Sequence, residues 1–339
     1  METNCVFLLG AGFNADVNAE AGPIYGHSIH IGEHQIQCTY PLLADLPQIC
    51  FRNGPFPSNT SIERLLAEAQ AGGQQDPLKR LARAIMKADY YLVPEITRQD
   101  SSNCYVRFFD RFQKAQFLTF NYDSLVEASL FRQGLWFPED GYGVPVLANR
   151  SGAGQPSDQS NSLVLHLHGT FCLYISDHQF IDPTGSGVEW YEDVSPPRYV
   201  FDPDSISNLF RPYLRTMPTF GYEPIENRVI APVPDKTIGL QKAFVDRIYQ
   251  RAKELLECAD VLIAIGYGFG ANDETSYIPL LSALKRQKTS RLVIVDPMAN
   301  SIGVRLQHQI PTTNVCAFDL TLKHWVEQGC PLSHTSASV

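Results

Sequence analysis

Six short apolar segments along the chain have the pattern of strands that are buried on both faces. Each is a nearly continuous run of apolar residues rather than an alternation of apolar and polar positions, which is typical of a parallel sheet covered by helices. The predicted strands are Cys5–Leu9, Gln116–Asn121, Leu163–His168, Val261–Ile265, Arg291–Asp296 and Val315–Phe318.

Amphipathic segments between these runs predict helices. The clearest is Leu240–Ala259, in which apolar residues recur at helical spacing and form one stripe. Thr60 and Glu63 have the spacing of a capping box, and Pro77 is typical of the first turn of a helix that extends to about Tyr91. Strands and helices alternate, so we expect an α/β fold with a Rossmann-like, mostly parallel sheet and helices on both faces. Further helices are expected at about 103–113, 123–131, 274–286 and 322–326.

The chain is expected to form one domain over residues 1–330, interrupted by two insertions. The segment 60–115 predicts a helical insertion between the first two strands. The segment 173–236 is rich in Pro, Asp, Tyr and Phe without a clear period, so it predicts an irregular insertion. The last residues, 331–339, are rich in Ser and are expected to fray.

Composition narrows the functional classes. A formal net charge of −9 argues against a large basic surface, and hence against direct binding of nucleic acid. The eight cysteines are scattered without a Cys-x-x-Cys pair, which indicates neither a zinc ribbon nor a dense disulfide scaffold. The N-terminus lacks a basic region, and no apolar run reaches the roughly 20 residues of a membrane span. We therefore expect a soluble, cytoplasmic protein without membrane contact.

A glycine loop follows the first predicted strand. Residues 10–15, Gly-Ala-Gly-Phe-Asn-Ala, match the pattern G-x-G-x-x-G/A, in which the backbone approaches a pyrophosphate at a helix N-terminus. This spacing predicts a dinucleotide or phosphate ligand, and the alternative is a purely structural turn. An NAD-dependent dehydrogenase would show a second strand ending in an acid about 20 residues later. A Gly- and His-rich segment follows instead, so a simple dehydrogenase fits poorly.

Polar or flexible residues end four other predicted strands. Asn121, His168, Gly266 and Asp296 each stand where an apolar run stops. The carboxyl ends of parallel strands meet at one edge of a sheet, where open α/β folds bind their ligands. We therefore expect these residues and the glycine loop to share one site.

Two groups of histidines have spacings that metal ligands use. His27, His30 and His34 lie in an aperiodic stretch with no accompanying cysteine or carboxylate cluster. His166 and His168 are two residues apart on a predicted strand, which permits a metal pair. We expect neither group to hold a metal ion.

The order and content of these segments resemble the sirtuin-like family of NAD-consuming proteins, and most closely its bacterial anti-phage branch. The resemblance covers nearly the whole chain. It is carried by the Gly-Ala-Gly loop, a Thr-x-Asn-x-Asp segment, a His-Gly pair, a glycine loop with an Asp beyond it, and the end of a late strand at 295–296, which binds ribose in the family.

This resemblance implies roles for individual residues. Asn121 and His168 are expected to act on the ribose or on water, with Asp123 orienting the Asn-bearing loop. The residues expected to contact NAD are Gly10, Ala11, Gly12, Phe13, Asn14, Thr119, Gly266, Tyr267, Gly268, Asp273 and Asp296.

The chain departs from the family pattern in three places. The family usually has Ser at the position of Asn14 and Ser or Thr at that of Gly268, so amide contacts are expected to replace hydroxyl contacts. Protein-deacylating members carry four zinc-binding cysteines soon after the His-Gly pair. Here no cysteine occurs between Cys172 and Cys258, so we expect no zinc and do not favour deacylation.

The resemblance implies hydrolysis of NAD to nicotinamide and ADP-ribose as an effector of bacterial anti-phage immunity. ADP-ribosyl transfer or cyclisation at the same site is one alternative, and a non-catalytic NAD or ADP-ribose binding module is another. An unrestrained NAD hydrolase would poison its cell, so we expect control through a homo-oligomer and a separately encoded partner. In this branch such partners include ring-forming ATPases and Argonaute-type proteins.

Overall fold

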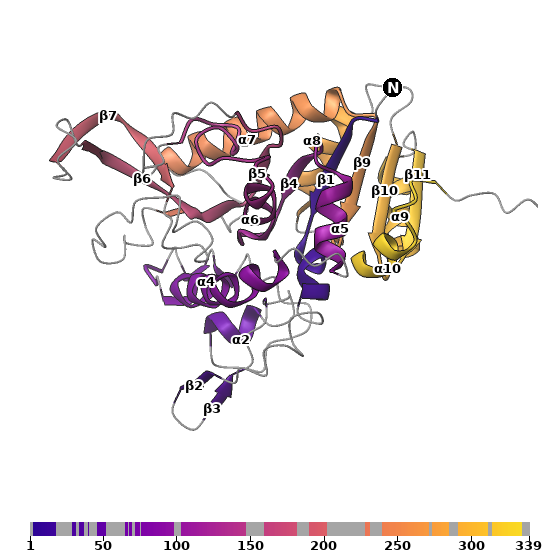
Figure 1. The fold of residues 1–339 in the computed structure, drawn as a ribbon, viewed down its shortest axis with the longest axis horizontal. Helices are drawn as coiled ribbons and strands as arrows, with labels where there is room; N and C mark the ends of the chain where they lie inside the picture. Colours follow the sequence, from indigo (N-terminus) through magenta and orange to yellow (C-terminus); the bar gives the residue numbers. More distant parts are fainter. Residues whose placement is uncertain are drawn as a thin grey trace, which may run out of the picture.

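A six-stranded parallel sheet lies at the centre of the protein (Figure 1). Neighbouring strands are parallel throughout, and all residues of β1 and β9 are buried, as expected for strands covered on both faces. In spatial order the strands are β11 (Asn314–Asp319), β10 (Arg291–Asp296), β9 (Val261–Ile265), β1 (Cys5–Leu9), β4 (Gln116–Thr119) and β5 (Val164–His166).

The structure is a computed structural model. It describes residues 3–17, 29–31, 34–36, 40, 46–51, 65–66, 68–69, 72–74, 76–97, 103–146, 159–181, 190–201, 228–230, 239–270, 273–284, 291–310 and 314–333. The predicted capping box at Thr60 and Glu63 lies outside these residues.

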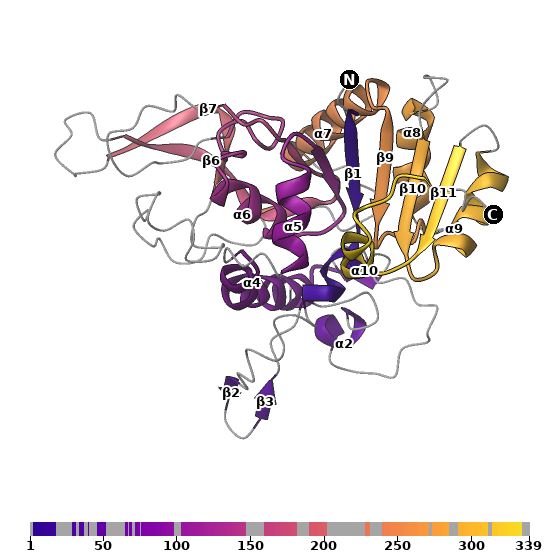
Figure 2. The ribbon, with the colours of Figure 1, turned by 45° about the vertical axis from the view of Figure 1, so that its right-hand side comes forward.

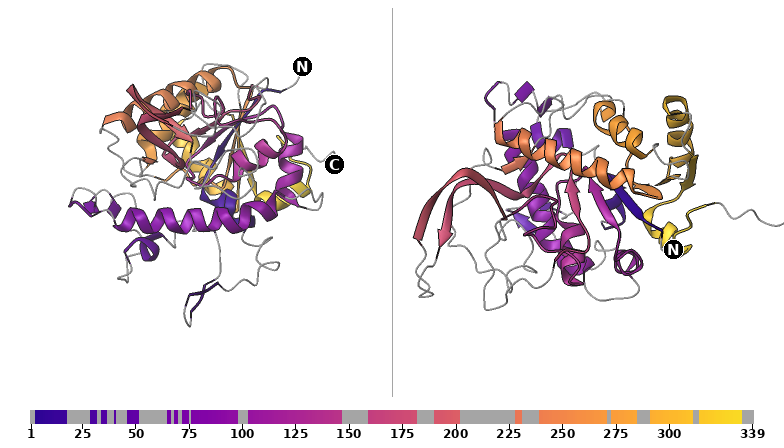
Figure 3. Two further views of the ribbon diagram at one scale, coloured as in Figure 1. Left: turned by 60° about the vertical axis from the view of Figure 1, so that its left-hand side comes forward. Right: turned by 90° about the horizontal axis from the view of Figure 1, so that it is seen from above.

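Helices cover both faces of the sheet (Figure 3). Packing between the sheet and one of these layers is aromatic: Phe7 of β1 contacts Phe108 of α5 and Phe112, the residue that follows this helix, with ring centroids 5.0 and 4.8 Å away. These features confirm the predicted Rossmann-like α/β fold. One face carries α5 (Cys104–Arg111), α6 (Leu125–Arg132) and α10 (Leu322–Glu327), and the other carries α7 (Gly239–Glu257), α8 (Glu274–Leu284) and α9 (Ala299–Gln309).

The strand order places a topological switch point beside β1. Numbered along the chain within this sheet, the strands run 6-5-4-1-2-3, which is the order of the dinucleotide-binding Rossmann fold. The chain leaves β1 toward β4 and β5 and returns to β9 on the other side of β1. Ligands of such sheets bind where this order reverses, outside the carboxyl ends of the strands.

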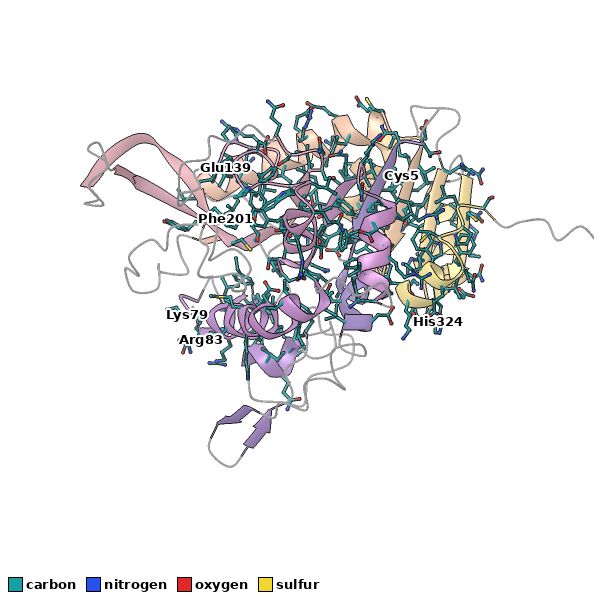
Figure 4. The ribbon with its side chains drawn as sticks, viewed as in Figure 1. Cys5, Lys79, Arg83, Glu139, Phe201 and His324 are labelled. Atoms are coloured by element: carbon teal, nitrogen blue, oxygen red, sulfur yellow. The ribbon has the colours of Figure 1, made fainter. Side chains whose placement is uncertain are left out.

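The helical insertion lies beside that carboxyl edge. Helices α2 (Leu46–Phe51) and α4 (Asp76–Ile96) lie below the ends of β1 and β4 in Figures 1 and 2. Leu81 and Ile85 are among the buried residues of α4, whereas Arg83 lies on its exposed side (Figure 4). Helix α5 begins as predicted, since the Asn103 side chain accepts hydrogen bonds from the first free amides.

The segment expected to be irregular differs from that prediction. Strands β6 (Gly169–Ile181) and β7 (Trp190–Phe201) form a long antiparallel hairpin that projects from the body, and β8 (Arg228–Ile230) pairs with β6 (Figures 1 and 2). Strand β7 contains Pro196 and Pro197, and proline is rare in the interior of a sheet because it has no amide hydrogen to donate. Proline is tolerated on edge strands, and β7 is an edge of its three-stranded sheet.

The remaining elements complete the description. Strands β2 (Ile29–Ile31) and β3 (His34–Ile36) form a small antiparallel pair, and the 3-10 helix η1 spans Ala11–Asn14. Among the described residues, no helix is long and apolar enough to cross a membrane.

Candidate functional site

Two glycine loops cross at the switch point between β1 and β9. The amide of Gly10 donates to the Ile265 carbonyl at 3.1 Å, and that of Gly12 donates to the Gly266 carbonyl at 3.0 Å. A Cβ on Gly266 would lie 2.2 Å from the Gly12 carbonyl carbon, and Gly266 has a φ of +60°. Close approach of the two loops therefore requires these glycines.

The glycine loop is anchored from below by its aromatic residue. Ala11, Gly12, Phe13 and Asn14 form η1, and Phe13 is fully buried. Its ring contacts that of Tyr105 edge-on at 5.3 Å, and the Tyr105 hydroxyl donates to the Phe13 carbonyl at 2.5 Å. Phe13 thus holds the loop against the core.

Asn121 is held at its main chain and at its side chain. Its amide N–H donates to Thr119 Oγ1 at 3.0 Å, and its carbonyl lies 2.9 Å from Nδ1 of His166. Its Nδ2 donates to the Gly10 carbonyl at 3.0 Å, which ties the end of β4 to the glycine loop. The half-buried Asn121 side chain is therefore placed directly beside the predicted phosphate loop.

His168 lies among aromatic rings next to a carboxylate. The Phe120 ring meets it edge-on at 4.7 Å and stacks on Tyr267 at 4.4 Å. Oδ1 of Asp273 lies 4.0 Å from Nε2 of His168, and the Tyr267 hydroxyl donates to Asp273 Oδ2 at 3.2 Å. The predicted residues His168, Tyr267 and Asp273 thus lie close together, with Phe120, which was not predicted, between the first two rings.

Asn14 and Asp123 face each other in the interior. Nδ2 of Asn14 donates to Asp123 Oδ2 at 2.7 Å, and the Leu125 amide donates to Asp123 Oδ1 at 3.2 Å. Burial raises the pKa of Asp123 to about 6 against the opposing effect of these hydrogen bonds. Asp123 therefore braces the turn between β4 and α6 from inside.

Asp123 belongs to a larger set of buried polar residues, of which Asp89 and Glu127 were not predicted from the sequence. Asp89 accepts hydrogen bonds from the Tyr40 hydroxyl at 2.5 Å and from the Ser124 hydroxyl at 2.9 Å, and burial raises its pKa well above the ordinary value. Glu127 and His166 form a hydrogen bond at 2.6 Å, and both side chains are completely buried. We call Asp89, Asp123, Glu127 and His166 the buried polar cluster. Asp89 of α4 and Glu127 of α6 are acids on the buried faces of their helices, and this placement is the feature of the sequence that could have indicated the cluster.

The other two predicted contact residues lie further along the same edge. Gly268 is exposed, and a Cβ there would meet no described atom within 4 Å. Arg305 donates to the carbonyls of Gly268 and Phe269, which steadies this loop. Asp296 ends β10, separated from β1 by β9, and its Oδ1 accepts from the Met298 amide at 2.8 Å.

The described residues contain no group of three or more His, Cys, Asp or Glu side chains arranged for a metal ion. His30 and His34 lie in β2 and β3, and His27 lies outside the described residues. His166 and His168 have different surroundings, since the first bonds Glu127 and the second packs against Phe120.

Comparisons with known proteins give structural matches alone. No family model matches the chain, and no curated protein matches it in sequence. A Sir2 homologue in complex with NAD aligns over 96% of this chain and 87% of its own, with 14% identity and a TM-score of 0.43. A Sir2 homologue triple mutant bound to 2′-O-acetyl ADP-ribose covers 98% of this chain and 95% of its own, with 15% identity and a TM-score of 0.42. These similarities are low, so a functional assignment rests on the residues of the site.

Proposed function

We propose that the protein cleaves the bond between nicotinamide and ribose in NAD and transfers the ADP-ribosyl group to water. The observation that carries this proposal is the meeting of the Gly10–Gly12 loop, Asn121 and His168 at a Rossmann switch point. Such a point suits a dinucleotide, with the glycine loop beside its pyrophosphate. The resemblance of the motifs to sirtuin-like proteins supports the same substrate.

The chemistry requires few groups. Nicotinamide leaves as a neutral molecule, so its departure needs no general acid, unlike ordinary glycoside hydrolysis. What remains is to fix the ribose and to accept a proton from a ribose hydroxyl or from water. His168 is the proton acceptor in this proposal, and the Asp273 carboxylate, 4.0 Å away, stabilises the imidazolium that forms.

Asn121 fixes the acceptor in the same scheme. Its Nδ2 is engaged with the Gly10 carbonyl, so Oδ1 is the atom that receives a hydrogen bond from the attacking water or a ribose hydroxyl. Asp123 acts indirectly, by bracing the turn that carries Asn121. Gly266, Tyr267, Gly268 and Asp296 line the path of the remaining dinucleotide along the sheet edge in this proposal.

The biological role follows from the resemblance to the anti-phage branch. We propose a cytoplasmic effector that depletes NAD, needs no zinc and contacts neither membrane nor nucleic acid directly. Control comes from a homo-oligomer and from a separately encoded partner, such as a ring-forming ATPase or an Argonaute-type protein. The projecting β6–β7 hairpin is the segment that we expect to make such contacts (Figure 2).

Incubation of the purified protein with NAD tests the proposal. Chromatography should show nicotinamide and ADP-ribose in equal amounts. Cyclic ADP-ribose or ADP-ribosylated protein would indicate cyclisation or transfer instead. Binding of NAD without release of nicotinamide, both alone and with the product of a neighbouring gene, would indicate a binding module and overturn the proposed hydrolysis.

A further inference from the structure

We propose that His166 is a positioning residue: it holds the main-chain carbonyl of Asn121 and thereby aims the Asn121 amide, with Glu127 holding the imidazole ring in place. The inference deepens the proposed NAD cleavage and rests on it for its catalytic consequence. Its geometric content concerns only residues of this chain.

Both ring nitrogens of His166 are engaged. Nδ1 lies 2.9 Å from the Asn121 carbonyl oxygen, and Nε2 lies 2.6 Å from Glu127 Oε1. The His166 and Glu127 side chains are 0% exposed, so neither reaches a ligand. His166 therefore acts on the site through Asn121, unlike His168 two residues later.

The two contacts fix how many protons the pair holds. A carbonyl oxygen only accepts, so Nδ1 must carry a hydrogen. At 2.6 Å, one proton must also lie between Nε2 and Oε1, because otherwise two lone pairs would face each other. The pair is then either imidazolium with carboxylate or imidazole with carboxylic acid. Both forms are neutral overall and keep both hydrogen bonds.

The surroundings favour the charged form of the ring. Burial opposes the charge, but attraction and hydrogen bonding to Glu127, the Asn121 carbonyl and the nearby Asp123 carboxyl raise the pKa of His166 above its ordinary value. The Tyr142 hydroxyl donates to the same Glu127 oxygen at 3.4 Å. The ring is thus held as a donor toward Asn121.

Asn121 depends on this donor because its other anchors lie elsewhere. Thr119 fixes the amide N–H, and Gly10 receives the side-chain Nδ2, but the carbonyl is turned toward His166. Loss of that bond frees the peptide between Asn121 and Tyr122 to rotate. A displacement of about 1 Å at a reacting group costs on the order of a hundredfold in rate.

Two substitutions separate the two halves of the contact. The amide nitrogen of His166→Asn can replace Nδ1 and keep the bond to Asn121, whereas that of His166→Gln can replace Nε2 and keep only the bond to Glu127. His166→Gln loses the bond to the Asn121 carbonyl and His166→Asn loses the bond to the buried Glu127 carboxyl, so turnover is compared only under conditions in which both variants are folded. We expect kcat for NAD to fall about a hundredfold in His166→Gln and less than about tenfold in His166→Asn. Equal losses, or no loss in either, would overturn the inference.

A third variant covers the case in which both fail to fold. Glu127→Gln keeps the shape of the pair, since its amide can donate to Nε2 of a neutral ring that retains the Nδ1 hydrogen. We expect turnover within about threefold of wild type. A folded Glu127→Gln protein with a hundredfold loss would contradict a purely positioning role.

Crystal structures of the variants provide a readout that does not depend on NAD. The Asn121 carbonyl should keep its place in His166→Asn and in Glu127→Gln, and should turn away in His166→Gln. If wild-type protein released no nicotinamide, the proposed function would fail while these structures would still decide the positioning inference. An unmoved carbonyl in His166→Gln would overturn it.

Discussion

His166 and His168 stand two residues apart, yet the structure gives them opposite surroundings. His166 is completely buried and bonded at 2.6 Å to Glu127, with its other nitrogen on a main-chain carbonyl. The His168 side chain is 10% exposed, and Asp273 Oδ1 lies 4.0 Å from its Nε2. The His166 ring is therefore hydrogen-bonded to its carboxylate, whereas the Asp273 carboxylate lies beside the His168 ring at a longer distance.

This difference separates support from chemistry. A histidine whose two nitrogens are committed cannot take a proton from a substrate without breaking its own contacts. His168, whose side chain is 10% exposed, can accept a proton and be stabilised afterwards by the Asp273 carboxylate. We therefore expect changes around His168 to reduce activity, and loss of the carboxylate from the buried His166–Glu127 pair to reduce stability.

The largest expected effect is the loss of NAD cleavage on substitution of His168 or Asn121. His168→Ala and Asn121→Ala should each lower NAD cleavage by about 10³-fold, because general base catalysis and fixation of the acceptor are lost. The melting temperature should stay close to that of wild type. His308→Ala, at an exposed position of α9, is the matched control. Folded variants that keep turnover within a few-fold of wild type would show that the site is elsewhere.

Substitution of Glu127, the buried partner of His166, should lower the stability of the protein. Glu127→Ala removes the partner of a buried imidazolium, and breaking a buried pair in this way costs about 3–5 kcal/mol of unfolding free energy. Urea denaturation of the variant measures this loss. Asp273→Ala, on the half-exposed side, should cost less than about 1 kcal/mol. Similar losses for the two substitutions would remove the distinction between the two histidine environments.

The free energy of unfolding should depend on pH through Asp123. Its pKa in the folded protein is about 6, above the ordinary value of 3.8. The stability that it contributes is therefore present below about pH 3.8 and is lost as the pH rises through about 6. Asp123→Asn carries no charge, so it should raise the unfolding free energy by about 1–3 kcal/mol at pH 8 and by much less at pH 4.

Denaturation curves at the two pH values test this prediction. A destabilised Asp123→Asn variant at pH 8 would mean that the ionised carboxylate, held by Asn14 and the Leu125 amide, is worth more than its burial costs.

The sequence predicted the sheet and much of the site edge for one physical reason. Buried parallel strands need continuous apolar runs, and their carboxyl ends must meet, so Asn121, His168 and Gly266 could be grouped without a structure. The β6–β7 hairpin escaped prediction because Pro196 and Pro197 conceal a strand that lies at a sheet edge.

Within the buried polar cluster, Asp123 was expected near the site, but its partners Asp89 and Glu127 could not be predicted in the same way. The bonds of the cluster join side chains far apart in sequence, such as His166 with Glu127, and depend on how α6 packs behind β5. Helix α9 was also missed, because its buried stripe contains few large apolar residues, chiefly Ile302 and Leu306. Local pattern fixes strand ends well and contacts between layers poorly.

Substitution of Asp273 should have a smaller effect on NAD cleavage and tests whether its charge supports His168. Asp273→Asn leaves the hydrogen bond from Tyr267 possible but removes the charge near His168. We expect NAD cleavage to fall about fivefold with unchanged stability, since one carboxylate near an imidazolium is worth about 1 kcal/mol at a partly exposed site. Glu274→Gln, whose neighbour is Gln309, is the control one residue away. Equal activity of the two variants would contradict the charge partnership.

The smallest expected effect is that of metal removal, which should be none. Carboxylates lie beside both His166 and His168, so we expect that no metal ion is needed to hold either ring. Cys172, the first cysteine after the His-Gly pair, is buried in β6, and the next cysteine, Cys258, is exposed in the turn that follows α7. A four-cysteine zinc module needs closely spaced thiolates, so chelation should change neither melting temperature nor turnover. Stoichiometric zinc by elemental analysis, with unfolding on chelation, would show that a metal site supports the fold and that carboxylates alone do not.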